Sequence, residues 1–399
     1  MPGIGLRLLA AGALAVWLAI PSLSRSPVVE RSSPSDLTVH EWGTFTSVAG
    51  PGGQAMEWLP LTGSTDLPAF VEHFRDAQFK CGLGGTVRME TPVMYFYSPR
   101  EATVSVKVSF AKGTITEWYP HASAVEPAVV RPQQATDGSI RWDEVRLLPG
   151  SHPGFPVGDR DNHYFAARNT AATPVRVKAR RGDQDEKFLF YRGVSSAPMP
   201  IAARLTAAGQ VSLENLGTEE IPGVILIESR GGKLGYRLAG ALRDRALLDP
   251  PPPTSSADSM FRNLEGMLVA RGLYVDEARA MIATWRNSWF EEGSRLLYIL
   301  PAPAVNAVLP LSVSPLPAST VRVFVGRLEL VTPATEAAVG QAFAEHDQRA
   351  LDQYRRFLEP ILRSMMAGAK ADPARMQALQ ADLNSVYSYA CRWPWPGDR

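Results

Sequence analysis

The sequence has few of the residues that mark a disulfide scaffold, a metal centre or a polyanion-binding protein. Its 399 residues include only two cysteines and six histidines. Two cysteines exclude the small secreted domains in which disulfide bonds replace a hydrophobic core. The 41 Lys and Arg balance 40 Asp and Glu, so no general positive field would attract nucleic acid, and we predict no nucleic-acid partner. A hydrophobic content of 45% is enough to bury two or three cores of ordinary domain size.

Long apolar runs are also scarce, and the one that is present lies at the N-terminus. Arg7 precedes thirteen apolar residues, Leu8–Ile20, which Pro21 ends, and the small residues Ser22 and Ser24 suit signal peptidase. Spanning a bilayer takes about 20 such residues. We therefore predict a signal peptide over residues 1–24 and a periplasmic or secreted location. An uncleaved membrane anchor is the alternative, and it is the one membrane contact we expect.

Strand patterns dominate the first half of the mature chain. A tether rich in Ser and Pro, residues 25–36, precedes them. The clearest strand is 104–110, where apolar residues alternate with polar ones, and Lys112-Gly113 then turns the chain into another strand. Seven or more short strands separated by turn residues predict an antiparallel β-sandwich over residues 37–248. The glycine runs 82–85 and 231–235 match no nucleotide-binding spacing and are predicted to be turns.

The pattern changes at the Pro-rich linker 249–258. Beyond it the apolar period becomes 3.6, and two apolar stripes separated by Gly272 predict a helical hairpin. Returning strands and further helices complete an α+β region over 259–390, in which Thr332 and Pro333 form a favourable helix start. Residues 391–399 form a tail. The predicted fold class is α+β, mainly β.

Familiar catalytic motifs are incomplete. His40-Glu41 opens a metalloprotease pattern, but Thr44 stands where the second histidine is needed and the segment has the character of a strand. The nearest approach to a nucleophile elbow, 193–197, lacks the second glycine. These failures favour a binding protein over an enzyme.

Three strand segments nevertheless carry a carboxylate beside an aromatic residue or a proline. If the strands are neighbours, Glu41, Glu90 and Glu117 line one cleft, in which repulsion and burial would raise at least one pKa. Aromatic rings beside them would offer flat faces to a ligand. The candidate binding residues are His40, Glu41, Trp42, Glu90, Glu117, Trp118 and Tyr119. The alternative is that the aromatic rings fill the core and the carboxylates accept hydrogen bonds from the backbone or face solvent, because successive strand residues point to opposite faces.

The densest group of metal-ligand residues lies between 152 and 163. His152, Asp159, Asp161 and His163 offer the nitrogen and oxygen donors that a divalent cation needs. The alternative is an exposed loop whose polar groups contact water. No sequence pattern requires a cofactor. If these four residues bind a ligand, we expect it to be a divalent metal ion.

The two cysteines lie at opposite ends of the mature chain. Cys81 and Cys391 would pair in an oxidising compartment and tie the tail to the first region. The alternative is that both stay as free thiols. A disulfide bond requires a short distance and a suitable orientation between the two residues, and the sequence does not give these.

Four segments resemble a group of exported bacterial proteins that have no known activity. They are His40-Glu41-Trp42-Gly43-Thr44-Phe45-Thr46, 89–97, Glu117-Trp118-Tyr119-Pro120 and 284–291. The resemblance extends from Val39 to Val331. It implies an extracytoplasmic bacterial protein and brings no substrate or cofactor with it.

We therefore predict an exported cell-envelope protein that binds a small molecule, a glycan or an envelope protein. The alternative is an extracytoplasmic hydrolase or metal-dependent enzyme with a carboxylate and histidine cleft. Convergence of those side chains in one cleft would distinguish the two.

Overall fold

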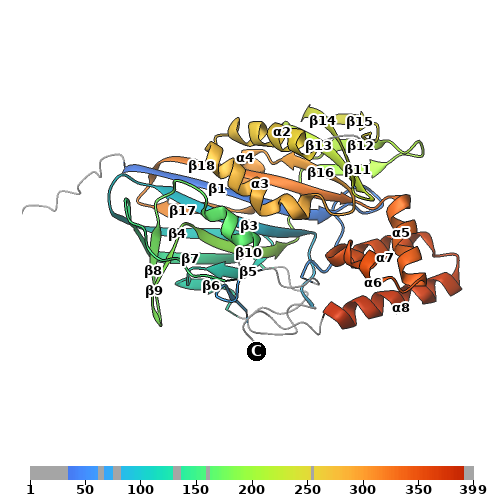
Figure 1. Ribbon diagram of the computed structural model, residues 1–399, viewed down its shortest axis with the longest axis horizontal. Helices are drawn as coiled ribbons and strands as arrows, with labels where there is room; N and C mark the ends of the chain where they lie inside the picture. The colour runs from blue at the N-terminus through green and yellow to red at the C-terminus, as the bar shows by residue number, and fades with distance from the viewer. Residues whose placement is uncertain are drawn as a thin grey trace, which may run out of the picture. The chain divides into compact units, whose positions relative to one another are not determined.

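A nine-stranded sheet forms the centre of the fold (Figure 1). The computed structural model describes residues 35–61, 67–74, 82–128, 136–158, 162–252 and 256–390. Ser35–Arg399 is one compact unit. The predicted signal peptide, most of the predicted tether, both cysteines and the predicted tail lie outside the described residues. In sheet order the nine strands are β14 (Lys233–Leu242), β13 (Ile221–Arg230), β16 (Gly293–Ile299), β18 (Pro317–Leu330), β1 (Ser35–Val48), β3 (Val87–Tyr97), β10 (Leu189–Ser195), β5 (Gly113–Tyr119) and β2 (Glu72–His73).

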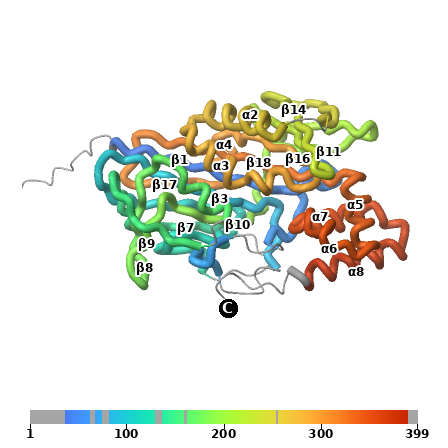
Figure 2. The backbone as a smooth tube through the Cα atoms, in the orientation of Figure 1, coloured from blue at the N-terminus to red at the C-terminus, as the bar shows by residue number. Residues whose placement is uncertain are grey.

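Strands from both halves of the chain meet in this sheet. β1 pairs in parallel with β18 on one side and antiparallel with β3 on the other, and Figure 2 shows β1 in blue beside β18 in orange. The regions before and after the Pro-rich segment 249–258 therefore share one sheet.

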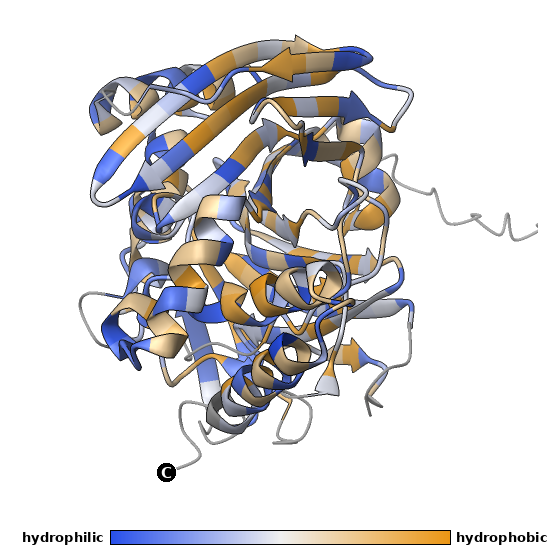
Figure 3. Ribbon diagram, turned by 90° about the vertical axis from the view of Figure 1, so that its right-hand side faces the viewer, coloured by the Kyte–Doolittle hydropathy of each residue, from blue (hydrophilic) through white to orange (hydrophobic). Residues whose placement is uncertain are grey.

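Two smaller sheets accompany it. The six-stranded sheet contains β17 (Leu311–Ser314), β4 (Ala102–Phe110), β7 (Gly138–Leu147), β8 (Val175–Ala179), β9 (Gly182–Glu186) and β6 (Ala124–Glu126). The three-stranded sheet contains β11 (Ile201–Leu205), β12 (Val211–Asn215) and β15 (Arg245–Leu248). Orange and blue residues alternate along many strands (Figure 3), as the period-2 pattern predicts.

Helices lie on both faces and at one end of the central sheet. They are η1 (His163–Arg168), α2 (Ala257–Val269), α3 (Val275–Trp289), α4 (Ala302–Val308), α5 (Pro333–Ala344), α6 (Gln348–Asp352), η2 (Arg355–Phe357), α7 (Leu358–Gly368) and α8 (Pro373–Ala390). Thr332 caps α5 by accepting a hydrogen bond from the Thr335 amide, with Pro333 at the first helical position. No helix within the described ranges is both long and apolar enough to cross a membrane.

Three cores hold these layers together. Val39 and Phe45 of β1 pack between the central sheet and the smaller sheets. On the other face, Trp42 packs with the buried stripe Met260, Leu264 and Leu268 of α2. A third core joins α5 to α8 and includes Trp58, whose ring stacks on Phe357 with 5.7 Å between centroids. Mainly antiparallel sheets followed by C-terminal helices confirm the predicted α+β, mainly β fold class.

Candidate functional site

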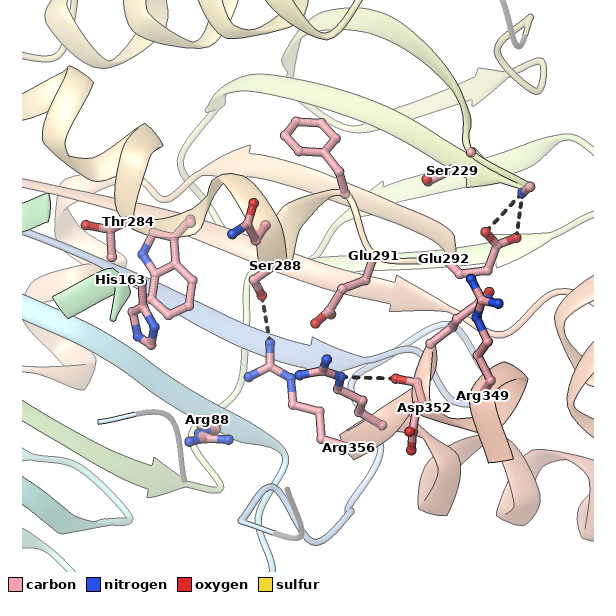
Figure 4. Close-up of a pocket in the computed structure, with 17 residues that line it drawn as sticks. Arg88, His163, Ser229, Thr284, Ser288, Glu291, Glu292, Arg349, Asp352 and Arg356 are labelled. Atoms are coloured by element: carbon pink, nitrogen blue, oxygen red, sulfur yellow. Dashed lines mark hydrogen bonds between the residues drawn. The ribbon is translucent and has the colours of Figure 1, made fainter. Parts of the chain in front are cut away.

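A cavity of about 720 Å³ opens between α3, the β13–β14 turn and the segment 349–356. Ligand pockets commonly enclose roughly 300–1,000 Å³. Gly231 and Gly232 form part of the cavity wall. Both have positive φ, which a two-residue hairpin turn of this kind requires, so the predicted glycine turn is present. Figure 4 shows Ser288 of α3 and Arg356 reaching toward each other across the site.

A buried carboxylate, Glu90 on β3, organises the arginines at the base of the cavity. Its side chain forms ion pairs with Arg88 and Arg356 and accepts a hydrogen bond of 2.8 Å from the Thr46 hydroxyl. Arg356 also donates to the Ser288 hydroxyl at 3.1 Å. Burial by itself would raise the pKa of Glu90, but the surrounding arginines, Arg356 foremost, hold it below its ordinary value. Glu90 is therefore a carboxylate at neutral pH.

A second buried carboxylate, Glu329 on β18, continues the network. Arg295 donates to it at 2.8 Å, and Arg327 forms the other ion pair. Arg327 reaches back to the cavity by donating to the Ser288 hydroxyl at 2.7 Å and to Glu291 at 3.0 Å. Burial opposes ionisation of Glu329, yet the two arginines lower its pKa.

Arginines are concentrated in this network. Five arginines, each at most 11% exposed, face three glutamates within the part of the chain that the structure describes. They are Arg88, Arg192, Arg295, Arg327 and Arg356, against Glu90, Glu291 and Glu329. Glu117, which is 3% exposed and opposite Arg192 in the strand register, is a fourth carboxylate beside these arginines.

Two buried donors in the cavity lining have no hydrogen-bond partner among the described residues. They are Arg356 Nε and Trp285 Nε1. The carboxylates of the lining are already engaged, since Glu291 pairs with Arg327 and Glu292 accepts from the Gly231 amide at 3.0 Å. An unpaired buried donor is costly, so the cavity suits a ligand that supplies acceptors.

Backbone strain accompanies the site. Thr91 and Arg355 have φ values of 48° and 35°, a region that side chains with a Cβ rarely adopt. Thr91 follows Glu90 and accepts a hydrogen bond of 3.3 Å from Arg192, while Arg355 lines the cavity. Strained residues of this kind cluster at functional sites.

The structure places the predicted binding residues in separate environments. His40 is buried, with its Nδ1 2.8 Å from Glu277 of α3 and its ring against Tyr97 and Tyr274. Trp42 lies in the core beneath α2 and α3. Both residues hold α3 on the sheet, and neither lines the cavity.

Glu41 and Glu90 have no contact partner in common. Glu41 accepts hydrogen bonds from the Tyr191 hydroxyl and from Arg322 Nε at 2.6 Å, whereas the partners of Glu90 are those of the cavity base. The structure thus separates two members of the predicted carboxylate cleft.

The remaining candidates lie on β5. Glu117 is opposite Arg192 in the strand register and accepts from the Thr116 hydroxyl. Trp118 Nε1 donates to Glu72 at 3.0 Å, and Tyr119 packs against Phe70. None of the three lines the cavity, but Glu117 lies beside Arg192 of the arginine network, and Arg192 also lowers the pKa of Glu90.

The structure describes two of the four predicted metal ligands, His152 and His163. His152 is exposed, while His163 lines the cavity with its Nε2 3.2 Å from Arg192. Asp159, Asp161, Cys81 and Cys391 lie outside the described residues. Within the described ranges, no three His, Cys, Asp or Glu side chains form a group able to hold a metal ion.

The arginine network beside the cavity is the part of the candidate site that the sequence analysis missed. A signal was present, because Arg88, Arg192, Arg295 and Arg327 interrupt apolar strand segments, and a buried arginine needs a partner. Their convergence depends on pairings between distant strands, which no local pattern specifies.

No protein-family model matches the sequence, and no curated protein matches it. Two solved structures show distant similarity: the Fcho1 mu homology domain of Danio rerio with bound Eps15 peptide, and the yeast delta-COP-I mu-homology domain complexed with a Dsl1 WxWxV peptide. Each is 8% identical, with a TM-score of 0.26, over 74% and 75% of this chain and 97% of each of those chains. Similarity at this level carries no argument about function.

Proposed function

We propose that this chain is an exported ligand-binding protein of the cell envelope and that the cavity beside α3 binds an anionic small molecule. The observation that carries the proposal is the pair of buried donors without partners among the described residues, Arg356 Nε and Trp285 Nε1, beside a cluster of arginines. A bound anion would supply the missing acceptors.

Binding is favoured over catalysis by the state of the reactive groups. The Ser288 hydroxyl accepts hydrogen bonds from Arg327 and Arg356, and His163 Nε2 faces a guanidinium nitrogen of Arg192. The hydrolase alternative needs carboxylates that share a cleft, and Glu41 and Glu90 have separate partners. We therefore develop only the binding function.

Export rests on the N-terminal pattern of Arg7 followed by Leu8–Ile20. Cell fractionation with N-terminal sequencing of the mature protein tests it. We expect a chain that begins at Arg25 outside the cytoplasm. A full-length chain in the cytoplasm would contradict export and leave the binding proposal to its own test.

Calorimetric titration with small carboxylates, sulfates and phosphates tests binding. We expect at least one class to bind to the wild type and to bind more weakly to Arg356→Lys, which keeps a positive charge but loses the Nε donor. Arg243→Gln is the matched control, because this side chain is 83% exposed and pairs with Glu220 away from the cavity. Binding that is absent in all three classes, or unchanged in Arg356→Lys, would overturn the proposal.

A further inference from the structure

We infer that the ligand of the cavity is an acidic sugar, in which one end carries the anionic group and the rest is a ring with several hydroxyl groups. This inference rests on the proposed function, because it keeps the anion site beside Arg356 and specifies the remainder of the ligand. A uronate carboxylate and a sugar phosphate both supply the anionic group, and the binding experiment has an arm for each.

Ser288 adds a third donor to the anion end of the cavity. A serine hydroxyl has one hydrogen to donate and two lone pairs that accept. Arg327 Nη1, at 2.7 Å, and Arg356 Nη2, at 3.1 Å, both donate to the Ser288 oxygen. Its own hydrogen has no acceptor within the described ranges, and the residue lines the cavity. Together with Trp285 Nε1 and Arg356 Nε, it leaves three donors for an oxygen group that carries no hydrogen of its own.

The cavity is much larger than an anionic group alone. Its volume of about 720 Å³ lies in the range of roughly 300–1,000 Å³ that holds whole organic ligands. A carboxylate or phosphoryl group would fill only the end beside Ser288 and Arg356. The cavity extends from there to Ser229 on β13, which Figure 4 shows well away from Arg356. The ligand is therefore an organic acid with a sizeable body.

The wall around this remaining volume carries side chains that both donate and accept hydrogen bonds. Ser229, Asn287 and Gln353 line the cavity, and in the part of the chain that the structure describes none of these side chains has a hydrogen-bond partner. Glu292 accepts there from the Gly231 amide alone, so its carboxylate keeps free lone pairs. A hydroxyl group also donates and accepts. Several hydroxyl groups on one body would therefore pair with this wall.

The apolar part of the lining favours a ring over an open polar chain. Phe290 lines the cavity and is held edge to face against Phe261, with 5.0 Å between the ring centroids. An aromatic ring offers a flat apolar surface, against which the C–H groups of a sugar ring pack while its hydroxyl groups point outward. A purely aliphatic acid would instead cover the polar wall without pairing it, which is costly.

Two matched pairs of acids separate the hydroxyl groups from the charge. Glucuronate and cyclohexanecarboxylate both carry a carboxylate on a six-membered ring, and only glucuronate has hydroxyl groups. Glucose 6-phosphate and cyclohexylmethyl phosphate make the same comparison with a phosphoryl group, and glucose is the probe without charge. By calorimetry at pH 8, we expect the sugar of at least one pair to bind about tenfold or more tightly than its hydroxyl-free partner, because each hydroxyl group that pairs with the wall adds to the binding free energy. The pair with the larger advantage identifies the acidic group.

Two buried serines on neighbouring strands give matched variants. Ser229 is 8% exposed and lines the cavity from β13, whereas Ser294 is 6% exposed and lies on β16 outside the lining. Because Ser229 is opposite Gly293 in the strand register, Ser294 points to the other face of the sheet. Ser229→Ala should weaken the sugar acid about fivefold more than its hydroxyl-free partner. Ser294→Ala should leave the ratio of the two affinities unchanged.

Arg356→Lys provides the complementary result. This substitution removes a donor at the anion end, so it should weaken both members of a pair by the same factor. The two ends of the cavity are then assigned separately, the anion end by Arg356→Lys and the hydroxyl end by Ser229→Ala.

Failure of this inference differs from failure of the proposed function. If each hydroxyl-free acid binds as tightly as its sugar partner, or if Ser229→Ala and Ser294→Ala behave alike, the acidic sugar is overturned while anion binding stands. If glucose binds as tightly as both sugar acids, anion binding is overturned together with the acidic sugar. If none of the five probes binds, the acidic sugar is overturned, and the anion-binding function then depends on the wider titration of small anions.

Discussion

Arg356 in η2 forms an ion pair with Glu90 on β3, 266 residues earlier in the chain. The pair joins the C-terminal helices to the central sheet at the base of the cavity. It therefore contributes to stability as well as to the site.

Replacing Arg356 should destabilise the fold. Arg356→Gln leaves the Glu90 carboxylate buried with Arg88 and Thr46 as its remaining close partners, and removal of one member of a buried pair costs about 3 kcal/mol. Urea denaturation measures the change, with Arg243→Gln expected to stay within about 0.5 kcal/mol of the wild type. Equal stability of the two variants would show that the ion pair contributes nothing.

Acid should weaken the fold through Glu90 and Glu329. Both pKa values lie below the ordinary 4.5 in the folded chain. As pH falls below about 4.5, the unfolded chain takes up protons that the folded chain resists, so the free energy of unfolding decreases. Glu186 and Glu359 have raised pKa values because of burial, and their contribution has the opposite sign.

A single variant isolates the Glu90 contribution to this pH dependence. Between pH 5 and pH 3, Glu90→Gln should lose less stability than the wild type, as measured by denaturant titration at each pH. Glu220→Gln, at a side chain 40% exposed, is the control and should follow the wild-type slope. A Glu90→Gln slope equal to that of the wild type would contradict the assignment.

Gly326 should tolerate no side chain. It lies opposite Tyr298 in the β16–β18 register, and an added Cβ would lie 2.0 Å from the ring Cζ. Tyr298 is buried, so we expect Gly326→Ala to cost about 3 kcal/mol or more. In a Tyr298→Ala background, Gly326→Ala should cost much less stability, because the ring is gone. Gly154→Ala is the second control: a Cβ there meets open space, so the loss of stability should be about 0.5 kcal/mol or less. Thermal denaturation of the four variants checks this.

Glu277 should be important for docking α3 on the sheet. Its fully buried carboxylate contacts His40 Nδ1 at 2.8 Å, accepts from the Tyr97 hydroxyl at 2.8 Å and from the Tyr274 amide at 2.7 Å. Glu277→Ala leaves these groups without their acceptor, at a cost of about 2–4 kcal/mol. Chemical denaturation should show this loss, whereas Glu265→Ala on α2, at a side chain 27% exposed, should change little.

Local patterns determined much of the secondary structure. The alternation in 104–110 became β4, the apolar stripe of α2 is buried, and Thr332 caps α5. Each of these features depends on residues that are close together in the chain, so the sequence alone was sufficient to predict them. The same periodicity also predicted an α+β, mainly β fold.

Only the tertiary structure decided which charged residues meet. Glu41 and Glu90 both lie on strands of the central sheet, yet one faces Tyr191 and Arg322 while the other faces the arginines of the cavity. The register of each strand determines which partners each carboxylate faces. That register depends on pairing between strands that are far apart in the sequence, such as β1 and β18. The nearly zero net charge of the chain was visible in its composition. The local concentration of arginines was not, because it arises from β3, β10, β16, β18 and η2, which come together only on folding.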